Sequence, residues 1–312
     1  MGREDLETLI GSVGTVDHRD VEWANVRRTA FLIHQHLRYE YPGRIHDLHQ
    51  RLIIIPPERY GGQRLVTHKL EIPGLAVPAP FVTMREERDD FGNLVVNLFV
   101  DQVERAIDFT AWIVVERDAT EGPVRLPATA GADLRLLDPS PLTEPDGALR
   151  TAARELGPGG GDAWTLAERI NARVHERMTY AHGATGVRTN AADALALGRG
   201  VCQDYAHIML ALCRLRGLPA RYVSGHLLGE GGTHAWVEVL LPDPRGDGAL
   251  VAQPFDPTNG CTPGLNYITV AVGRDYGDVA PTSGTFRAPY GGRLSARKRA
   301  GITALEYFTA TA

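Results

Sequence analysis

The chain has 312 residues, of which 43% are hydrophobic and 23% are charged, a composition typical of a folded globular protein with room for two domains. Its 33 basic and 38 acidic residues give a formal net charge of −5 without long blocks of one sign, which argues against nucleic acid as a partner. Residues 1–27 contain no apolar signal-peptide core, and no run of about 18 apolar residues follows. We therefore expect a cytoplasmic protein that makes no membrane contact.

The first third of the chain has the pattern of β-strands, because apolar and polar residues alternate and turn signals such as Pro56-Pro57 separate the runs. The expected strands lie at about 30–41, 49–55, 64–73, 94–101 and 106–117. Short strands at this spacing predict an antiparallel β-sandwich over residues 28–118, preceded by an N-terminal extension at 1–27.

Residues 119–161 are rich in proline and glycine and are interpreted as a linker. A second domain is predicted over residues 162–312, C-terminal strands included. Asp162 is placed to cap a helix, and Asn190 to start a shorter one that stops at Gly198.

The run CQDYAHIMLALCRLR, residues 202–216, predicts a buried helix, because its apolar residues cover most of the circumference and Gly217 ends it. Cys202 occupies the first turn, after a segment Gly198-Arg199-Gly200 that is expected to be flexible. Free amides and the positive end of the helix dipole stabilise a thiolate there, and the same amides are suited to hold an oxyanion.

Three interpretations of Cys202 compete: a buried structural thiol, a zinc ligand and a nucleophile. Zinc is disfavoured because no second cysteine lies two to four residues away and no HExxH is present. The three cysteines, Cys202, Cys213 and Cys261, match no disulfide framework, and Cys213 is expected in the core. A nucleophile requires a base elsewhere in the chain.

A candidate base lies in a predicted hairpin, with strands at about 233–241 and 249–256 and a loop centred on Arg245. A symmetric hairpin would place His234 directly opposite Asp256, with side chains about 5 Å apart. Such a pair would hold the imidazole in one orientation.

Alternation along the first strand assigns Ala235, Val237 and Val239 to the core and His234 to the other face with Trp236 and Glu238. Taken singly, His234 could be a hydrogen-bonded sheet histidine and Asp256 a turn former. Together with a cysteine at a helix start, they meet the requirements for nucleophile, base and orienting residue.

The motifs GRGVCQDYAHIMLALCRLRGLPARYVSGHL, GGTHAWVEVLL and FDPTNG resemble the transglutaminase-like superfamily of papain-fold cysteine enzymes in its bacterial form. The resemblance is close over residues 162–262, and the region before them is similar to the N-terminal region of bacterial members. It implies an α+β fold, with an antiparallel β-sandwich followed by a papain-like core. It also implies Cys202 as nucleophile, His234 as general base and acid, and Asp256 as the residue that orients the histidine.

The implied chemistry is acyl transfer from a peptide or glutamine-type amide through a thioester, with no cofactor and no metal. Hydrolysis is expected to exceed calcium-dependent crosslinking, because Gln203 follows the cysteine where animal transglutaminases carry tryptophan and no calcium loop is recognisable. The expected partner is a protein or peptide substrate.

Two alternatives remain open on sequence alone. The first is a protein-binding or scaffolding module with an intact but unused triad, since fold does not guarantee activity. The second is a zinc hydrolase using His175, His182, His207 and His226. The basic C-terminal segment RLSARKRAG is interpreted as solvated.

Overall fold

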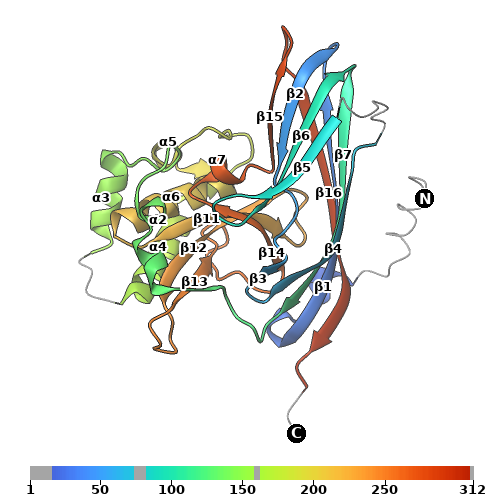
Figure 1. The fold of residues 1–312 in the computed structure, drawn as a ribbon. Helices are drawn as coiled ribbons and strands as arrows, with labels where there is room; N and C mark the ends of the chain where they lie inside the picture. The colour runs from blue at the N-terminus through green and yellow to red at the C-terminus, as the bar shows by residue number, and fades with distance from the viewer. Residues whose placement is uncertain (1–15, 74–81, 158–161, 310–312) are drawn as a thin grey trace.

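The computed structural model describes residues 16–73, 82–157 and 162–309. It has the predicted mixed α+β fold, and three larger antiparallel sheets dominate the described residues. Figure 1 shows the helices gathered at one side of the molecule and the long strands of a sandwich at the other. No helix in the described ranges is long and apolar enough to cross a membrane.

The sandwich consists of two packed sheets. Its strands are β1 (Val26–Glu40), β2 (Ile45–Leu52), β3 (Arg59–Tyr60), β4 (Gln63–Glu71), β5 (Val82–Arg88), β6 (Leu94–Val103), β7 (Ala106–Asp118), β15 (Thr282–Arg287) and β16 (Arg293–Tyr307). One sheet has the order β16-β1-β7-β4-β3 and the other the order β15-β2-β6-β5. Their inner faces bury one cluster of apolar side chains, which includes Phe31, Ile33 and Phe109. Two short 3₁₀ helices, η1 (His18–Asp20) and η2 (Trp23–Asn25), precede β1.

The C-terminal strands belong to this sandwich. β16 pairs with β1 along its length, from Tyr307 beside Val26 to Arg293 beside Glu40, and β15 pairs with β2. The prediction that grouped these strands with the rest of residues 162–312 therefore differs from the structure. The basic segment RLSARKRAG was expected to be solvated; most of its residues are exposed, and it forms part of β16. Sequence alternation indicates which face of a strand is buried but not which distant strand it pairs with.

The remaining elements form the second unit. Its helices are η3 (Ala128–Ala132), α2 (Leu134–Leu137), α3 (Gly147–Glu155), α4 (Ala163–Arg177), α5 (Ala191–Leu197), α6 (Cys202–Leu215) and α7 (Tyr276–Val279). Its strands are β8 (Arg125–Leu126), β9 (Thr179–Tyr180), β10 (Arg199–Gly200), β11 (Ala220–Leu227), β12 (His234–Pro242), β13 (Leu250–Phe255) and β14 (Tyr267–Gly273). The main sheet has the order β14-β11-β12-β13-β8.

The predicted helix boundaries are confirmed. Asp162 accepts a hydrogen bond from Thr165 N at 2.8 Å and caps α4, while Asn190 accepts one from Asp193 N at 2.8 Å and caps α5. Gly198 ends α5 with a φ of 66°, a left-handed conformation that favours glycine.

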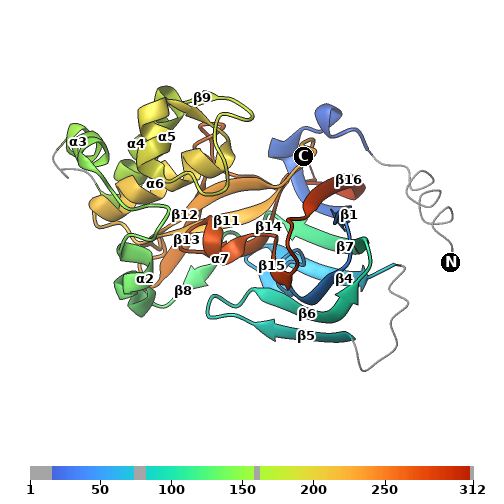
Figure 2. The same cartoon turned by 90° about the horizontal axis from the view of Figure 1, so that it is seen from above.

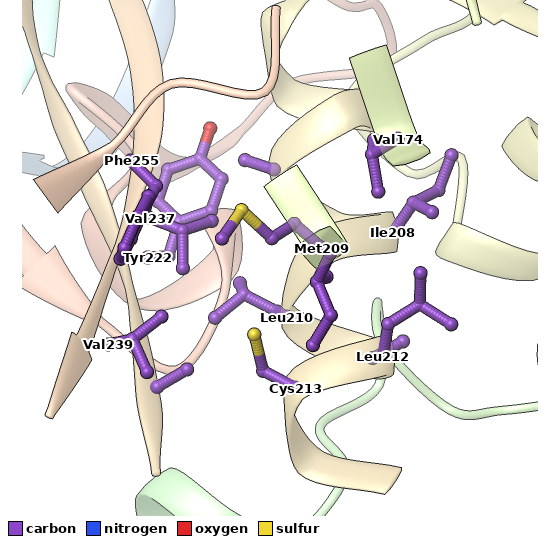
Figure 3. Packing of buried hydrophobic residues seen from close by; sticks show 14 of the residues in the cluster. Val174, Ile208, Met209, Leu210, Leu212, Cys213, Tyr222, Val237, Val239 and Phe255 are labelled. Carbon is purple, nitrogen blue, oxygen red and sulfur yellow. The ribbon is translucent and has the colours of Figure 1, made fainter. Parts of the chain in front are cut away.

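Helix α6 is buried against the sheet, as its apolar circumference predicts. Figure 3 shows Met209, Leu210 and Cys213 facing Val237 and Val239 of β12. A helix held by packing on this scale provides a rigid base for the residue at its N-terminus.

Side-chain amides join the sandwich to the second unit. Gln63 bonds both backbone groups of Thr269, at 2.7 and 2.9 Å, and Asn93 bonds both of Val272, at 2.7 and 2.8 Å. In Figure 2, β14 lies between the helices and the sandwich, where these bonds are made. The sandwich thus completes the hydrogen bonding of β14, a strand at the edge of its own sheet.

Candidate active site

Cys202 is the first residue of α6 and its side chain is partly exposed. The turn that carries it is fixed by Asp204, whose Oδ2 accepts hydrogen bonds from Val201 N at 2.7 Å and from Thr185 Oγ1 at 2.6 Å. Burial raises the pKa of Asp204, and these two donors oppose that effect. At the first residue of a helix, the Cys202 amide has no intrahelical acceptor and is open to a ligand.

The segment before Cys202, which was expected to be flexible, takes part in a short pair of strands. Arg199 and Gly200 form β10, which pairs in parallel with β9. A Cβ at Gly200 would lie 2.3 Å from Asp204 Oδ2, so the position admits only glycine. Glycine here permits a close approach between the capping carboxylate and the backbone.

The imidazole of His234 and the carboxylate of Asp256 are hydrogen-bonded and buried. His234 Nε2 lies 2.8 Å from Asp256 Oδ2, and the residues are 1% and 0% exposed. The predicted hydrogen bond is therefore present, within the predicted range of about 2.7 to 3.2 Å.

The register that produces this bond differs from the predicted one. Val237 pairs with Phe255, which centres the hairpin on Gly246 instead of Arg245, and Asp256 follows the end of β13. Direct opposition of the pair was therefore a wrong prediction. The two side chains still meet because moving the centre by one residue shifts the pairing by two, and an even shift keeps side chains on the same face.

Asp256 is held by donors in addition to the histidine. Its Oδ2 accepts from Tyr267 Oη at 2.8 Å and Asn259 Nδ2 at 2.7 Å, and its Oδ1 accepts from Thr258 N at 2.9 Å. Burial alone would raise its pKa, but the bonds from His234, Tyr267 and Asn259 leave the pKa below the ordinary value. Asp256 is thus both the turn former and the partner of the histidine.

Tyr267 and Asn259 were not predicted as partners of Asp256. Asn259 lies in the FDPTNG motif, where an amide three residues after an aspartate was a usable signal for a turn that folds back on the carboxylate. Tyr267 begins an apolar strand, and nothing in that pattern separates it from a core residue.

His234 is surrounded by anionic or ionisable groups. Burial lowers its pKa, but the hydrogen bond with Asp256, followed by contacts with Cys202 and Glu230, outweighs burial and raises the pKa above its ordinary value. Nδ1 lies 3.2 Å from Glu230 Oε2 without a well-aligned hydrogen bond, and Cys202 is close enough to contribute to the raised pKa of the ring. Loose contacts of this kind are common before substrate binds.

Among the polar residues outside the triad, Tyr180 lies near Cys202. Burial and then the nearby Cys202 raise the pKa of its hydroxyl to about 12. His207 lies elsewhere: it is buried, its Nε2 accepts from Tyr276 N at 3.2 Å, and burial lowers its pKa to about 4. Cys213 lies in the core as predicted, and burial raises its pKa to about 12.

The histidines named for the zinc alternative are dispersed. His175 on α4 bonds Thr258 O at 3.0 Å, His182 packs on Tyr180, and His226 on β11 faces Lys298. Within residues 16–73, 82–157 and 162–309, no three histidine, cysteine or acidic side chains are grouped as metal ligands.

Comparison with known proteins identifies the family. Residues 150–248 match the model of the transglutaminase-like superfamily, and residues 31–116 match that of the bacterial transglutaminase-like N-terminal region. An uncharacterized protein of Mycobacterium tuberculosis is 31% identical over 248 residues, covering 71% of this chain and 76% of its own. One from Mycobacterium leprae is 41% identical over 123 residues, covering 36% and 41%. The chain belongs to the bacterial transglutaminase-like superfamily.

A solved structure supports the fold. The chain resembles a candidate cysteine protease from Cytophaga hutchinsonii with a TM-score of 0.68 and 21% sequence identity, over 91% of this chain and 93% of the other. The similarity extends across sandwich and core, so the two share an architecture.

Proposed function

We propose that this protein is a cysteine-dependent amide hydrolase or acyltransferase that acts on peptide or glutamine-type amide bonds. The observation that carries the proposal is the buried His234–Asp256 pair, with Cys202 at the start of a rigid helix and close enough to His234 to contribute to its raised pKa. A raised histidine pKa favours the imidazolium, so the ring is suited to take the thiol proton and stabilise a thiolate.

The reaction would proceed in two steps. The Cys202 thiolate attacks the amide carbonyl carbon, and the Cys202 amide donates a hydrogen bond to the developing oxyanion. His234 then protonates the departing amine or ammonia, which leaves a thioester. In the second step His234 takes a proton from water, the resulting hydroxide attacks the thioester carbonyl, and the thiolate leaves with release of a carboxylic acid.

Asp256 would act through His234. Its carboxylate engages Nε2, which leaves Nδ1, 3.2 Å from Glu230 Oε2, as the nitrogen that would exchange a proton with Cys202. The Tyr267 and Asn259 contacts hold the carboxylate in turn, which pre-organises the pair.

The test is a product analysis without added metal. Glutamine peptides incubated with a primary amine should yield mostly acid product, because Gln203 replaces the family tryptophan and no calcium loop is recognisable. Cys202→Ala is the control and should form neither product. Predominant amine adduct or strict calcium dependence would contradict the hydrolytic preference, and absence of any acyl-enzyme on Cys202 would favour the binding module.

A further inference from the structure

A cavity of about 410 Å³ lies between the sandwich and the loop that joins β11 to β12. This volume is in the range of small-ligand sites. Strands β1 and β16 form one wall, and residues 229–231 of the loop form the other. Figure 2 shows β11 and β12 running toward the part of the molecule that holds β1 and β16.

The loop wall is pressed against the first residues of the sandwich. Gly229 has a φ of +94°, and a Cβ there would lie 2.5 Å from His18 Nε2. On the other side of the cavity mouth, Lys298 of β16 donates a hydrogen bond to Gly232 O. Contacts from two parts of the sandwich therefore set the position of this loop.

The cavity adjoins the candidate active site through Glu230. This residue lines the cavity, and its Oε2 lies 3.2 Å from His234 Nδ1. A group bound in the cavity would thus lie one side chain away from the histidine. A substrate with its scissile amide at Cys202 could extend into this space.

The described lining residues carry more positive than negative charge. Lys298 and Arg299 are cationic, and Glu230 is the single acidic side chain among them. The chain as a whole has a net charge of −5 and contains only two lysines, so this is a local reversal of sign. Such a region attracts anions.

The Lys298 ammonium has the carboxylate of Glu230 as its acidic neighbour among the described lining residues. Burial lowers the pKa of its ammonium to about 8, and Glu230 opposes that shift. The ammonium contacts Gly232 O and lies 3.4 Å from His226 Nδ1, which leaves one of its three N–H groups for a ligand. An anion in the cavity would add a second negative charge beside this ammonium.

We propose that this cavity binds a carboxylate of the substrate, with Lys298 and Arg299 as its partners. The proposal rests on the proposed function and narrows its substrate class to peptides with a carboxylate near the scissile amide. Lys298 and Arg299 are adjacent on β16, the edge strand of its sheet, so their side chains leave the strand on opposite faces and approach a carboxylate at that edge from two sides. Because Glu230 lies on the loop side, the carboxylate is directed toward β16 and the neutral amide toward His234. The carboxylate can come from an acidic side chain or from a free C-terminus.

The test measures binding to the full-length Cys202→Ala variant, in which turnover is absent. Three labelled peptides distinguish the sources: one with glutamate and an amidated C-terminus, one with glutamine and an amidated C-terminus, and one with glutamine and a free C-terminus. One of the two carboxylate peptides should bind about 10-fold more tightly than the neutral peptide, the effect of one charge-assisted hydrogen bond.

Arg299→Gln and Lys298→Met should each reduce this preference to about 3-fold or less. Arg297→Gln is the matched control, because Arg297 is exposed on the same strand, pairs with His36 and does not line the cavity. It removes the same charge and should leave the preference within about 2-fold. In the enzyme with Cys202, Arg299→Gln should raise KM for the acidic substrate and leave kcat unchanged.

Equal binding of the three peptides would overturn the proposal. Equal effects of Arg299→Gln and Arg297→Gln would also overturn it, since the preference would then come from net charge. Hydrolysis without carboxylate preference would reject this subsite alone, whereas carboxylate-selective binding without acylation of Cys202 would reject the proposed function alone.

Discussion

Strand β12 has two buried faces that differ in chemistry. On one face Ala235, Val237 and Val239 pack against α6 as hydrocarbon (Figure 3). The other face presents His234, Trp236 and Glu238 toward β14 and the sandwich. Glu238 accepts a hydrogen bond from Arg221 Nε at 2.8 Å and another from Tyr60 of the sandwich.

The difference separates stability from chemistry within one strand. Burial of apolar area stabilises the fold without directional requirements. Buried charges cost desolvation energy and are tolerated only when partners satisfy them. Each buried charge therefore requires its partners at defined positions. Substitutions on the apolar face should therefore act on stability alone. Substitutions on the polar face should act on reactivity at His234, and on stability at Glu238, where they break a buried ion pair.

Asp256→Asn should give the largest effect. Removing the charge beside His234 lowers the basicity of the ring and lets an amide favour the wrong tautomer, so kcat/KM for amide hydrolysis should fall by about 1,000-fold or more. The turn should survive, because the remaining side-chain oxygen can still accept from Thr258 N. Steady-state kinetics on the purified variant measure the loss, and a decrease below about 10-fold would mean that the carboxylate does not orient the histidine.

Glu238→Gln tests how much the part of the polar face away from Cys202 contributes to stability. It leaves the Arg221 guanidinium buried without its counter-ion, which should lower the free energy of unfolding by about 3 to 5 kcal/mol. Glu116→Gln is the control, since its ion pair with Arg64 lies nearer the surface and is worth about 1 kcal/mol or less. Denaturant unfolding of both variants measures the two changes in the free energy of unfolding. Equal decreases would show that burial of the Arg221–Glu238 pair does not affect stability.

Val237→Ala sharpens the comparison from the apolar face. Loss of two buried methyl groups and the resulting cavity should reduce the free energy of unfolding by about 2 kcal/mol. Activity per folded molecule should remain within about 2-fold, because the side chain points away from His234. If kcat/KM of the variant fell by much more than 2-fold while its unfolding midpoint in denaturant was as expected, the apolar face would also affect reactivity.

The smallest effect is the pH dependence of the His234–Asp256 pair. The lowered pKa of Asp256 contributes stability above about pH 4 that is lost as the pH falls through the folded-state value. The raised pKa of His234 contributes stability that is complete below about pH 6.5 and declines as the pH rises toward its folded-state value. The stability difference between the wild-type chain and Asp256→Asn should therefore peak between about pH 4 and 6.5, whereas a pH-independent difference would argue against the ion pair.

Helix ends and the buried faces of strands could be predicted from the sequence, because residues close together in the chain determine them. Helix α6 begins at Cys202 as predicted, and caps at Asp162 and Asn190 start the helices before it. The two faces of β12 were assigned correctly because strand alternation is local. Even the error in hairpin register left the His234–Asp256 contact intact, since the pairing shifted by an even number of residues.

Contacts between distant segments could not be predicted in this way. β16 pairs with a strand more than 250 residues earlier, and its sequence identifies no partner. Glu230 stands in a glycine-rich loop whose composition predicts only a turn, yet the fold brings it to His234. Tyr267 has the pattern of a core residue, and its hydroxyl acquires a role only when β14 is placed beside the FDPTNG turn.

The central claim is that His234 activates Cys202 as a nucleophile, and the most direct test is the rate of thiol alkylation at neutral pH. Iodoacetamide should label Cys202 well ahead of Cys213, whose pKa burial raises to about 12, and His234→Ala should reduce the Cys202 rate about 10-fold or more, toward that of a free thiol. Peptide mass analysis of the folded protein assigns each site. Equal labelling of the two cysteines, or a Cys202 rate unchanged in His234→Ala, would contradict the account.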